Sequence, residues 1–473
     1  MRRSNLNKSI GLLLAVLLTQ SCTLQPRFEL PEVDVPDQWR EQTNDIPLDV
    51  NIDWWEQFDD KVLNDLIYEA INYNYDLSFA IARVQEYCAR LVVAESALYP
   101  QLNLATSATR NEASRTTVVP AGTSRYYSLY QFALNASYQL DLFGQLNSLA
   151  DASLAQYLSQ VENRRGIIIT LVTGVANAYF QLLQYDEQLK ISRDTVKSRI
   201  ESYKIAKDRF EGGLTSELEV KQAESEVYDA QAQAIDFELN IELQENLLSI
   251  LIGKNPRAIP RGSQLVGLEL PVCIPEGLPS DVIAQRPDIR AAEHQIIAAN
   301  ANIGAARALL FPQLSLTGVF GFSSFQFNQL FVSDSRTWLY GINGNQAIFT
   351  GGNITGQIEV AEAQKCEAIA FYQQTILQAF REVNDALVSH QKAIEMVKVQ
   401  KERVKVLSDY LYLATLQYNN GETDYLNVLD AQRNLFNAQL DLAQAKGNTF
   451  ITIVNIYKAL GGGWVFELDD CIS

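Results

Sequence analysis

The sequence has little of several residue types on which enzymatic and metal-binding sites depend. Its 473 residues include 2 histidines and 2 methionines. His294 and His390 lie apart from any carboxylate motif, so the sequence shows no metal triad and no nucleophile with a neighbouring base. The scarcity of methionine argues against a thioether relay for copper or silver ions. The glycines at 461–463 lack the context of a phosphate-binding loop, and we expect neither a cofactor nor an enzymatic activity.

Basic residues and long apolar runs are also scarce. The chain has 38 Lys and Arg residues against 56 Asp and Glu residues, which gives a formal net charge of −18. Such an excess of negative charge repels phosphates and argues against a nucleic-acid partner. After the first residues, no segment offers the roughly 20 consecutive apolar residues of a membrane helix. If the chain crosses a membrane, we expect it to cross as strands.

The N-terminus has the features of an export signal. Basic residues precede an apolar run from Ile10 to Leu18, and Cys22 follows a small residue at the end of the segment. This pattern predicts a signal peptide over 1–21 and a bacterial lipoprotein cleavage site at which Cys22 is acylated. The alternative is an ordinary cleaved signal with an incidental cysteine. Residues 22–58, polar and Pro-bearing, are expected to form a lipid-anchored extended tether.

Four cysteines remain after Cys22: Cys88, Cys273, Cys366 and Cys471. Their spacing has none of the regularity of a disulfide scaffold. Cys273 and Cys471 lie outside the expected long helices and are candidates for a disulfide, whereas free buried thiols are the alternative.

An internal duplication organises the chain. Residues 209–224 resemble residues 417–432 at an offset of 208, and residues 98–102 resemble residues 310–314 at an offset of 212. The sequence therefore predicts two halves of one design, 59–270 and 271–473. In each half, glycines in the repeated stretch are expected to form the tip of a helical hairpin, followed by a residue that caps the next helix. The tip glycines are Gly212, Gly213 and Gly421, and the expected caps are Thr215, Ser216, Thr423 and Asp424.

Each half also carries two segments with a period of two. Apolar and aromatic residues alternate with polar ones in 101–109 and 126–142, and again in 313–323 and 337–348. An apolar, aromatic-rich face opposite a polar face is typical of transmembrane β-barrel strands. The edge of a soluble sandwich is the alternative. Because the smallest closed barrels have about eight strands, four strands require sister chains to complete a barrel.

Unusually long helices follow the second strand of each half. Mostly apolar residues recur in alternating steps of four and three up to Phe210 and, in the second half, up to Tyr418. These are heptad seams. The second half has two exceptions, the charged Lys401 and a slip of two successive steps of three from Lys401 to Leu407. A helix from Gly144 to Phe210 would be about 100 Å long at 1.5 Å per residue, which a lone globular core has no use for. Return helices are expected over 215–252 and 423–460.

Several motifs together resemble the TolC/OprM outer-membrane efflux channels, and more narrowly the NodT-type lipoprotein branch of tripartite RND-type pumps. The likeness spans essentially the whole chain after the signal. The stretches that carry it are Trp54–Phe58, Arg286–Glu293, Ile303–Arg307, Phe311–Gly318, Gly421–Arg433 and Tyr457–Trp464.

The resemblance implies a mixed α and β fold with two structural repeats per chain. It implies a homotrimer whose 12-stranded transmembrane β-barrel, four strands per chain, continues into a long periplasmic α-helical barrel. The implied function is a passive, gated duct in the outer membrane that exports small molecules. Its implied partners are a periplasmic membrane-fusion adaptor, an inner-membrane RND-type transporter and the lipid of the outer membrane.

The resemblance also implies where the duct closes. In such channels acidic and aromatic residues at the helical tips form the constriction, and matched positions place Asp430 in that ring with Asn427 at its companion position. Glu219 and Tyr418 match an acid and a tyrosine that hold the tip shut. Thr423 stands where that network has an arginine, which puts a salt-bridge latch in doubt. Capping or solvation of the helix start is the alternative role, and for Asp424 it is the one we adopt.

A second class of function is a periplasmic coiled-coil adaptor or structural protein without a pore. It would share the heptad seams. It should lack paired strands with one apolar and one polar face, and the presence of such strands therefore separates the two hypotheses.

Overall fold

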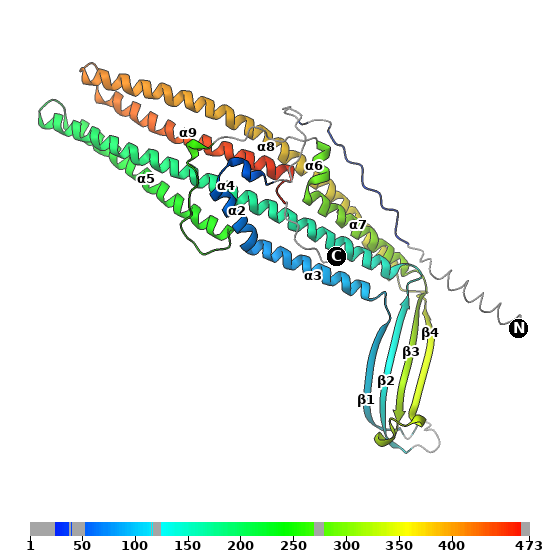
Figure 1. Ribbon diagram of the computed structural model, residues 1–473. Coiled ribbons are helices and arrows are strands. Elements are labelled where there is room, and N and C mark those ends of the chain that lie inside the picture. The colour runs from blue at the N-terminus through cyan, green and yellow to red at the C-terminus, as the bar shows by residue number, and fades with distance from the viewer. Residues whose placement is uncertain are drawn as a thin grey trace. The chain divides into compact units, whose positions relative to one another are not determined.

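The computed structural model describes residues 24–36, 39, 53–114, 116, 124–268 and 279–464. Helices and a single four-stranded sheet alternate along the chain (Figure 1). In order, the elements are η1 (Trp54–Phe58), α2 (Lys61–Tyr73), α3 (Tyr75–Ser96), β1 (Gln101–Glu112), β2 (Tyr126–Leu140), α4 (Gln145–Glu211), α5 (Glu217–Leu251), η2 (Leu265–Gly267), α6 (Pro279–Gln285), α7 (Pro287–Ala308), β3 (Gln313–Ser324), η3 (Phe327–Gln329), η4 (Ser333–Ser335), β4 (Arg336–Asn345), α8 (Asn353–Asn419) and α9 (Tyr425–Leu460).

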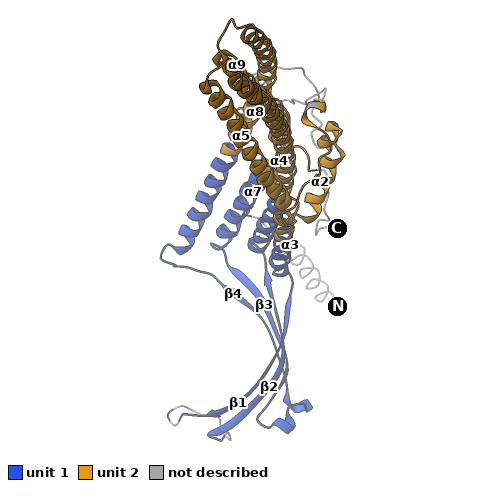
Figure 2. Cartoon of the chain, turned by 90° about the vertical axis from the view of Figure 1, so that its left-hand side faces the viewer, with its two compact units in different colours: residues 1–32, 84–160, 291–373 blue, residues 33–83, 161–290, 374–473 orange. Residues whose placement is uncertain are grey.

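Two compact units share these elements, and each draws on both halves of the sequence (Figure 2). The described residues of 1–32, 84–160 and 291–373 form unit 1, which holds the sheet. Those of 33–83, 161–290 and 374–473 form unit 2, which holds both hairpin tips. Several predictions fall outside the described residues: the signal peptide over 1–21, acylation of Cys22, the pairing of Cys273 with Cys471, and the boundary between 270 and 271.

The apolar spacing from Leu63 to Leu98 predicts a single helix, and this prediction is wrong, because the helix breaks at Asn74. Asn74 has an extended backbone (φ −67°, ψ 134°), and its side-chain oxygen accepts a hydrogen bond from the Leu77 N–H at 2.9 Å. It therefore caps the start of α3 in a way that an apolar periodicity does not reveal. The sequence offers Asp59 and Asp60 as caps for the start of α2, and Asp60 is the one used, since it accepts from the N–H groups of Val62 and Leu63.

The strands pair antiparallel in the order β1-β2-β3-β4. Register places Leu104 opposite Leu134, Leu134 opposite Phe320, and Phe320 opposite Trp338. Residues directly opposite each other share a face, so these side chains form one apolar face across all four strands. The same register puts Asn103 opposite Asn135 on the other face, where the Asn135 amide donates to the Asn103 oxygen at 3.3 Å. The sheet thus has the predicted apolar and polar faces.

The apolar face is open in the single chain. Phe320, Trp338, Tyr340 and Ile342 are 52%, 63%, 79% and 70% exposed. The outer edges of β1 and β4 have no strand partner among the described residues. Unpaired strand edges and an exposed apolar face are both unfavourable in water. The sheet therefore needs a partner that pairs its edges and covers its apolar face.

Strand β4 ends earlier than the sequence predicted. The alternation was followed to Ile348, but β4 ends at Asn345, whose partner Gln313 is the first residue of β3. Beyond that pair β3 has no further residue to extend the ladder, and Ile348 is 95% exposed outside any strand. Strand β2 ends at Leu140, opposite Leu314, so that Leu142 lies beyond the strand.

An aromatic core anchors the start of the packed chain in unit 2. The fully buried Trp54 stacks on Tyr457 with ring centroids 5.0 Å apart, and Phe58 contacts Phe180 at 4.9 Å. Gly463 makes this possible, because a Cβ there would lie 2.6 Å from the Trp54 ring nitrogen. The tryptophan motif and the glycines after α9 therefore belong to one packing arrangement.

One described helix, α4, is long and apolar enough to cross a membrane by length and composition. However, 67% of its apolar window is buried by the protein itself. Such burial is typical of the core helix of a packed body, so this window does not favour a membrane helix.

Gly321 in β3 gives a test of the sheet. A Cβ at Gly321 would lie 2.1 Å from the Phe132 carbonyl oxygen, so we expect Gly321→Ala to lower the free energy of unfolding in detergent by about 1–3 kcal/mol. Gly341→Ala is the matched control, because its Cβ would meet only Thr317 Oγ1, at 3.8 Å. Equal stability of the two variants, measured by denaturant titration, would contradict the strand packing described above.

Candidate functional site

The two hairpin tips close with the same backbone geometry. Gly213 and Gly421 adopt φ values of 72° and 78°, which favour glycine. After α4, the N–H groups of Gly213 and Leu214 donate to the carbonyls of Phe210 and Arg209 at 2.9 and 2.8 Å. After α8, Gly421 and Glu422 repeat the pattern with Tyr418 and Gln417. Both tips are therefore Schellman motifs, and Gly212 precedes the left-handed position rather than occupying it.

The residues expected to cap the return helices stand at the right positions but bond differently. Ser216 and Asp424 are the N-caps of α5 and α9, yet neither side chain makes a capping hydrogen bond. Thr423 instead accepts a short hydrogen bond from the Asn427 amide. The side chains of Thr423 and Asn427 are therefore joined along one helix start.

Tyr418 links the two hairpins of unit 2. Its hydroxyl donates to Glu219 Oε2 at 3.0 Å, which joins the end of α8 to the start of α5. Its ring lies 5.2 Å from Tyr425 and carries the Arg209 guanidinium 4.6 Å above its centroid. Burial, followed by the bond to Glu219, raises the pKa of Tyr418, so the hydroxyl remains a donor at neutral pH.

A buried apolar cluster surrounds Tyr418. Its members come from all four long helices of unit 2: Ala206, Ala223, Ala414, Tyr418, Tyr425, Val428, Leu429 and Ala431. Burial raises the pKa of Tyr425 to about 12. The hydrogen bond from Tyr418 to Glu219 thus lies at the edge of a dry cluster, where it is stronger than in water.

Asp430 takes no part in the hydrogen bond between Tyr418 and Glu219. Its side chain is exposed, and its Oδ2 accepts a hydrogen bond from the Asn434 amide at 3.0 Å. Asn427, three residues earlier on α9, is also exposed. The structure therefore joins Tyr418 with Glu219 and Asn427 with Thr423, and leaves Asp430 available on the surface of the helix.

The sequence did not predict a charge cluster near the tips, which is centred on the buried Glu226. Glu226 of α5 is contacted by Arg199 of α4 at 3.0 Å and by Arg433 of α9 at 2.5 Å, while Arg199 also donates to the Glu226 carbonyl at 2.6 Å. The side chains of Arg199 and Glu226 are each 4% exposed. Burial lowers the pKa of Arg199, and the carboxylate of Glu226 opposes that change. The missed signal was a charged residue, Arg199, on an otherwise apolar heptad seam.

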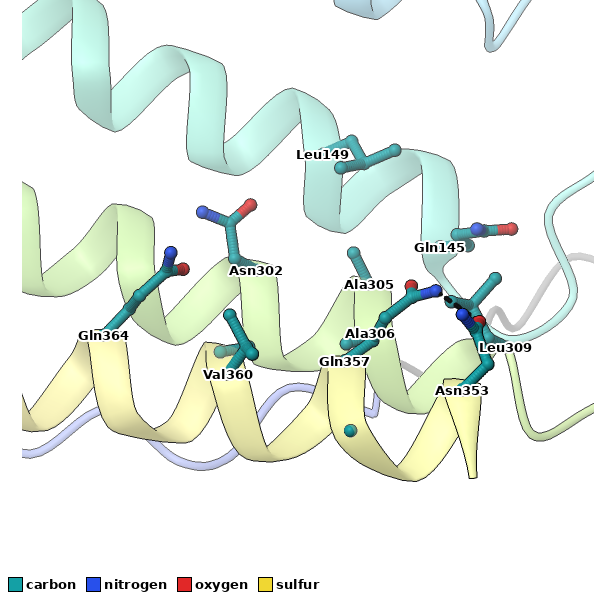
Figure 3. Close-up of a pocket in the computed structure, with 12 residues that line it drawn as sticks. Gln145, Leu149, Asn302, Ala305, Ala306, Leu309, Asn353, Gln357, Val360 and Gln364 are labelled. Atoms are coloured by element: carbon teal, nitrogen blue, oxygen red, sulfur yellow. Dashed lines mark hydrogen bonds between the residues drawn. The ribbon is translucent and has the colours of Figure 1, made fainter. Parts of the chain in front are cut away.

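A groove lies within unit 1 between the first turns of α4 and α8 and the last turns of α7 (Figure 3). Its volume is about 530 Å³. Amide side chains and small apolar groups line it, and Gln357 donates to Asn353 at 2.7 Å along one wall. A lining without ionisable side chains provides no acid, base or nucleophile.

The described residues hold no group of three or more His, Cys, Asp or Glu side chains that could bind a metal ion. His390 contacts Thr452 at 2.9 Å, and burial lowers its pKa.

Comparison with known proteins identifies the family. Residues 66–254 and 278–462 match the outer membrane efflux protein family. The chain is 36% identical to the toluene efflux pump outer membrane protein TtgI of Pseudomonas putida, over 95% of this chain and 97% of that protein. It is 33% identical to the probable outer membrane lipoprotein SilC of Salmonella typhimurium, over 95% and 97%. A crystal structure of a membrane protein from Pseudomonas aeruginosa is similar with a TM-score of 0.88 and 33% identity, over 96% of this chain and 100% of that chain.

These likenesses agree with the geometry. The mixed α and β fold is that of the trimeric TolC-type channels, and the predicted fold class is confirmed. The predicted function and outer-membrane location are confirmed as well, and the adaptor alternative is not favoured. The chain belongs to the outer membrane efflux protein family and is the outer-membrane channel component of an efflux pump.

Proposed function

We propose that three copies of this chain form one open 12-stranded barrel, to which each contributes its four strands. The observation that carries this proposal is the open sheet, with unpaired edges at β1 and β4 and an exposed apolar face. In lipid, every strand backbone group must be paired within protein, so each β4 pairs with the β1 of the next copy. The mass of the detergent-solubilised assembly tests the stoichiometry, and a dimer would contradict it.

The duct is passive in this proposal and catalyses no reaction itself. Outer-membrane proteins of tripartite efflux pumps work with a periplasmic adaptor and an inner-membrane pump. For this chain we infer a membrane-fusion adaptor and an RND-type transporter, which supplies the energy of export. The halves 59–270 and 271–473 act as two repeats, so each chain contributes two hairpins to the periplasmic duct.

The gate lies at the hairpin tips. The bond between Tyr418 and Glu219 joins the two hairpins of one chain, and it must break if one hairpin swings away from the other. The threonine at 423 does not supply the positive charge of a latch. Arg433 supplies a substitute, because it bonds from α9 to Glu226 of α5 and so also joins the two hairpins. Asp430, exposed on α9, contributes a carboxylate ring to the water-filled neck, with Asn427 as a neutral neighbour.

The N-terminal anchor is the last part of the proposal. Cys22 is acylated, and the chain just after it is held against unit 1. Gln25 donates to Ser148 at 3.2 Å and to Asp151 at 2.8 Å. Gly304 of α7 makes room for it, since a Cβ there would lie 2.4 Å from Gln25 Cγ. Contacts this close to Cys22 would fix where the lipid enters the membrane.

Tyr418→Phe tests the gate. The variant keeps the ring in its apolar cluster and removes only the hydrogen bond to Glu219, which is worth about 1 kcal/mol. We expect the open population, and with it the mean conductance in a planar bilayer, to rise about fivefold from a small resting value. Tyr412→Phe is the control, because Tyr412 is 69% exposed on the same helix. Unchanged conductance in Tyr418→Phe would remove the gate assignment.

Asp430→Asn tests the ring of carboxylates. Removing three negative charges from a narrow neck should lower its preference for cations, and the reversal potential in a potassium chloride gradient should move toward zero. Asp424→Asn is the matched control, since Asp424 is an exposed N-cap at the same tip without a capping bond. A larger shift with Asp424→Asn than with Asp430→Asn would reverse the two assignments.

Gly304→Val tests the contact between the N-terminal tether at Gln25 and helix α7 at Gly304. The added side chain should displace Gln25, and we expect trypsin to cleave after Arg27 about tenfold faster, as it would if docking contributes about 1.4 kcal/mol. Gly356→Val is the control, because a Cβ at Gly356 meets nothing within 4 Å. The N-terminal peptide released in this digestion should begin with an acylated Cys22. An unmodified cysteine there, or equal cleavage rates, would contradict the corresponding part of the proposal.

A further inference from the structure

The connection between β3 and β4 folds back onto the sheet. Residues 325–335 contain η3 and η4 and lie at the end of the strands remote from α7 and α8 (Figure 1). The Phe327 ring lies 5.5 Å from the Tyr130 ring, and the Phe331 ring lies 5.4 Å from that of Phe132 and 5.6 Å from that of Phe322. Pairing of Phe132 with Phe322, and of Tyr130 with Ser324, places these contacts on the apolar face.

The connection adds apolar surface to that face. Leu330 is 5% exposed, while Phe327, Phe331 and Val332 are 69%, 62% and 44% exposed. A loop surrounded by water would gain by turning these side chains inward. Here one apolar side chain faces inward and three face outward, on the side of the sheet that faces lipid in a barrel of this family. The exposed side chains are therefore continuous with a membrane-facing surface.

Positive charge accompanies these apolar side chains. Arg336 begins β4 opposite Phe322, so it shares their face, and it is exposed without an ion pair among the described residues. Arg110, opposite Ser128, lies on the same face near the same end of β1, and its guanidinium donates to the Ser128 hydroxyl at 3.0 Å. Guanidinium groups beside aromatic rings at a membrane interface suit the phosphates of lipid headgroups.

We propose that residues 327–336 form a collar at the outer end of the channel that binds lipopolysaccharide of the outer leaflet. Phe327, Phe331 and Val332 lie at the boundary between acyl chains and headgroups, and Arg336 pairs with a phosphate of the glycolipid. The orientation follows from the family, whose helices extend into the periplasm, so that the connection between β3 and β4 lies at the outer surface. The collar is independent of the gate and of Cys22.

The position of the collar is tested with the full-length protein in vesicles. Phe327→Trp is introduced together with Trp338→Phe, which removes the tryptophan of the apolar sheet face. Quenching of the fluorescence of the new tryptophan is then measured with lipids that carry a spin label near the headgroup. Phe325→Trp in the same background is the matched control, because the Phe325 ring contacts Tyr127, which register places on the polar face. We expect at least twofold stronger lipid quenching for Phe327→Trp. Equal quenching, or shielding of Phe327→Trp from both lipid and aqueous quenchers as a neighbouring copy would cause, overturns the proposal.

The identity of the lipid is tested by thermal unfolding in three membranes. Vesicles contain phosphatidylcholine alone, or with phosphatidylglycerol, or with lipopolysaccharide. We expect lipopolysaccharide to raise the unfolding temperature of the parent protein, and Arg336→Gln to lose most of that rise while unfolding normally in phosphatidylcholine. An equal rise with phosphatidylglycerol would overturn the assignment to lipopolysaccharide. No rise with any anionic lipid would overturn the proposed phosphate contact.

Discussion

A backbone group buried in lipid has no water to bond with, and this constraint governs the rest of the molecule. The inner strands β2 and β3 each pair with a strand on both sides, yet β1 and β4 each keep an outer edge without a strand partner in the described chain. The apolar face is likewise incomplete, with Trp338 and Tyr340 largely exposed. Each chain therefore supplies one segment of a barrel, and only its neighbours can satisfy it.

In the proposed gate, the helices of unit 2 hold together in water and separate at one end. Their apolar cluster around Tyr418 is built largely from alanine and tyrosine. Beside it lie polar links between the two hairpins, from Tyr418 to Glu219 and from Arg433 to Glu226. Charged and hydrogen-bonded links of this kind add little net stability and fix geometry instead, which suits a contact that must break.

Unit 1 relates to the membrane through more than its strands. The chain after Cys22 lies in a notch where Gly304 has no side chain, and the connection after β3 covers part of the apolar face with phenylalanines. Neither feature is required to pair the sheet. In our proposals both features concern where lipid meets protein, one through acylation of Cys22 and the other through exposed aromatic rings.

Much of this architecture follows from local patterns in the sequence. The strand and helix periods, the glycines at 213 and 421, and the proline and glycine boundaries predicted the order of elements, because each depends on neighbours a few residues away.

Contacts between distant segments could not be predicted in the same way. The break at Asn74 depends on a side chain that bonds to the backbone of α3, and the end of β4 depends on where its partner β3 begins. The ion pairs of the buried Glu226 with the buried Arg199 and the exposed Arg433 join three helices. The sequence by itself determined the elements and their faces, since these come from periodicity. Only the tertiary structure decided which charges meet and which edges stay open, because those properties belong to pairs of segments and not to either one.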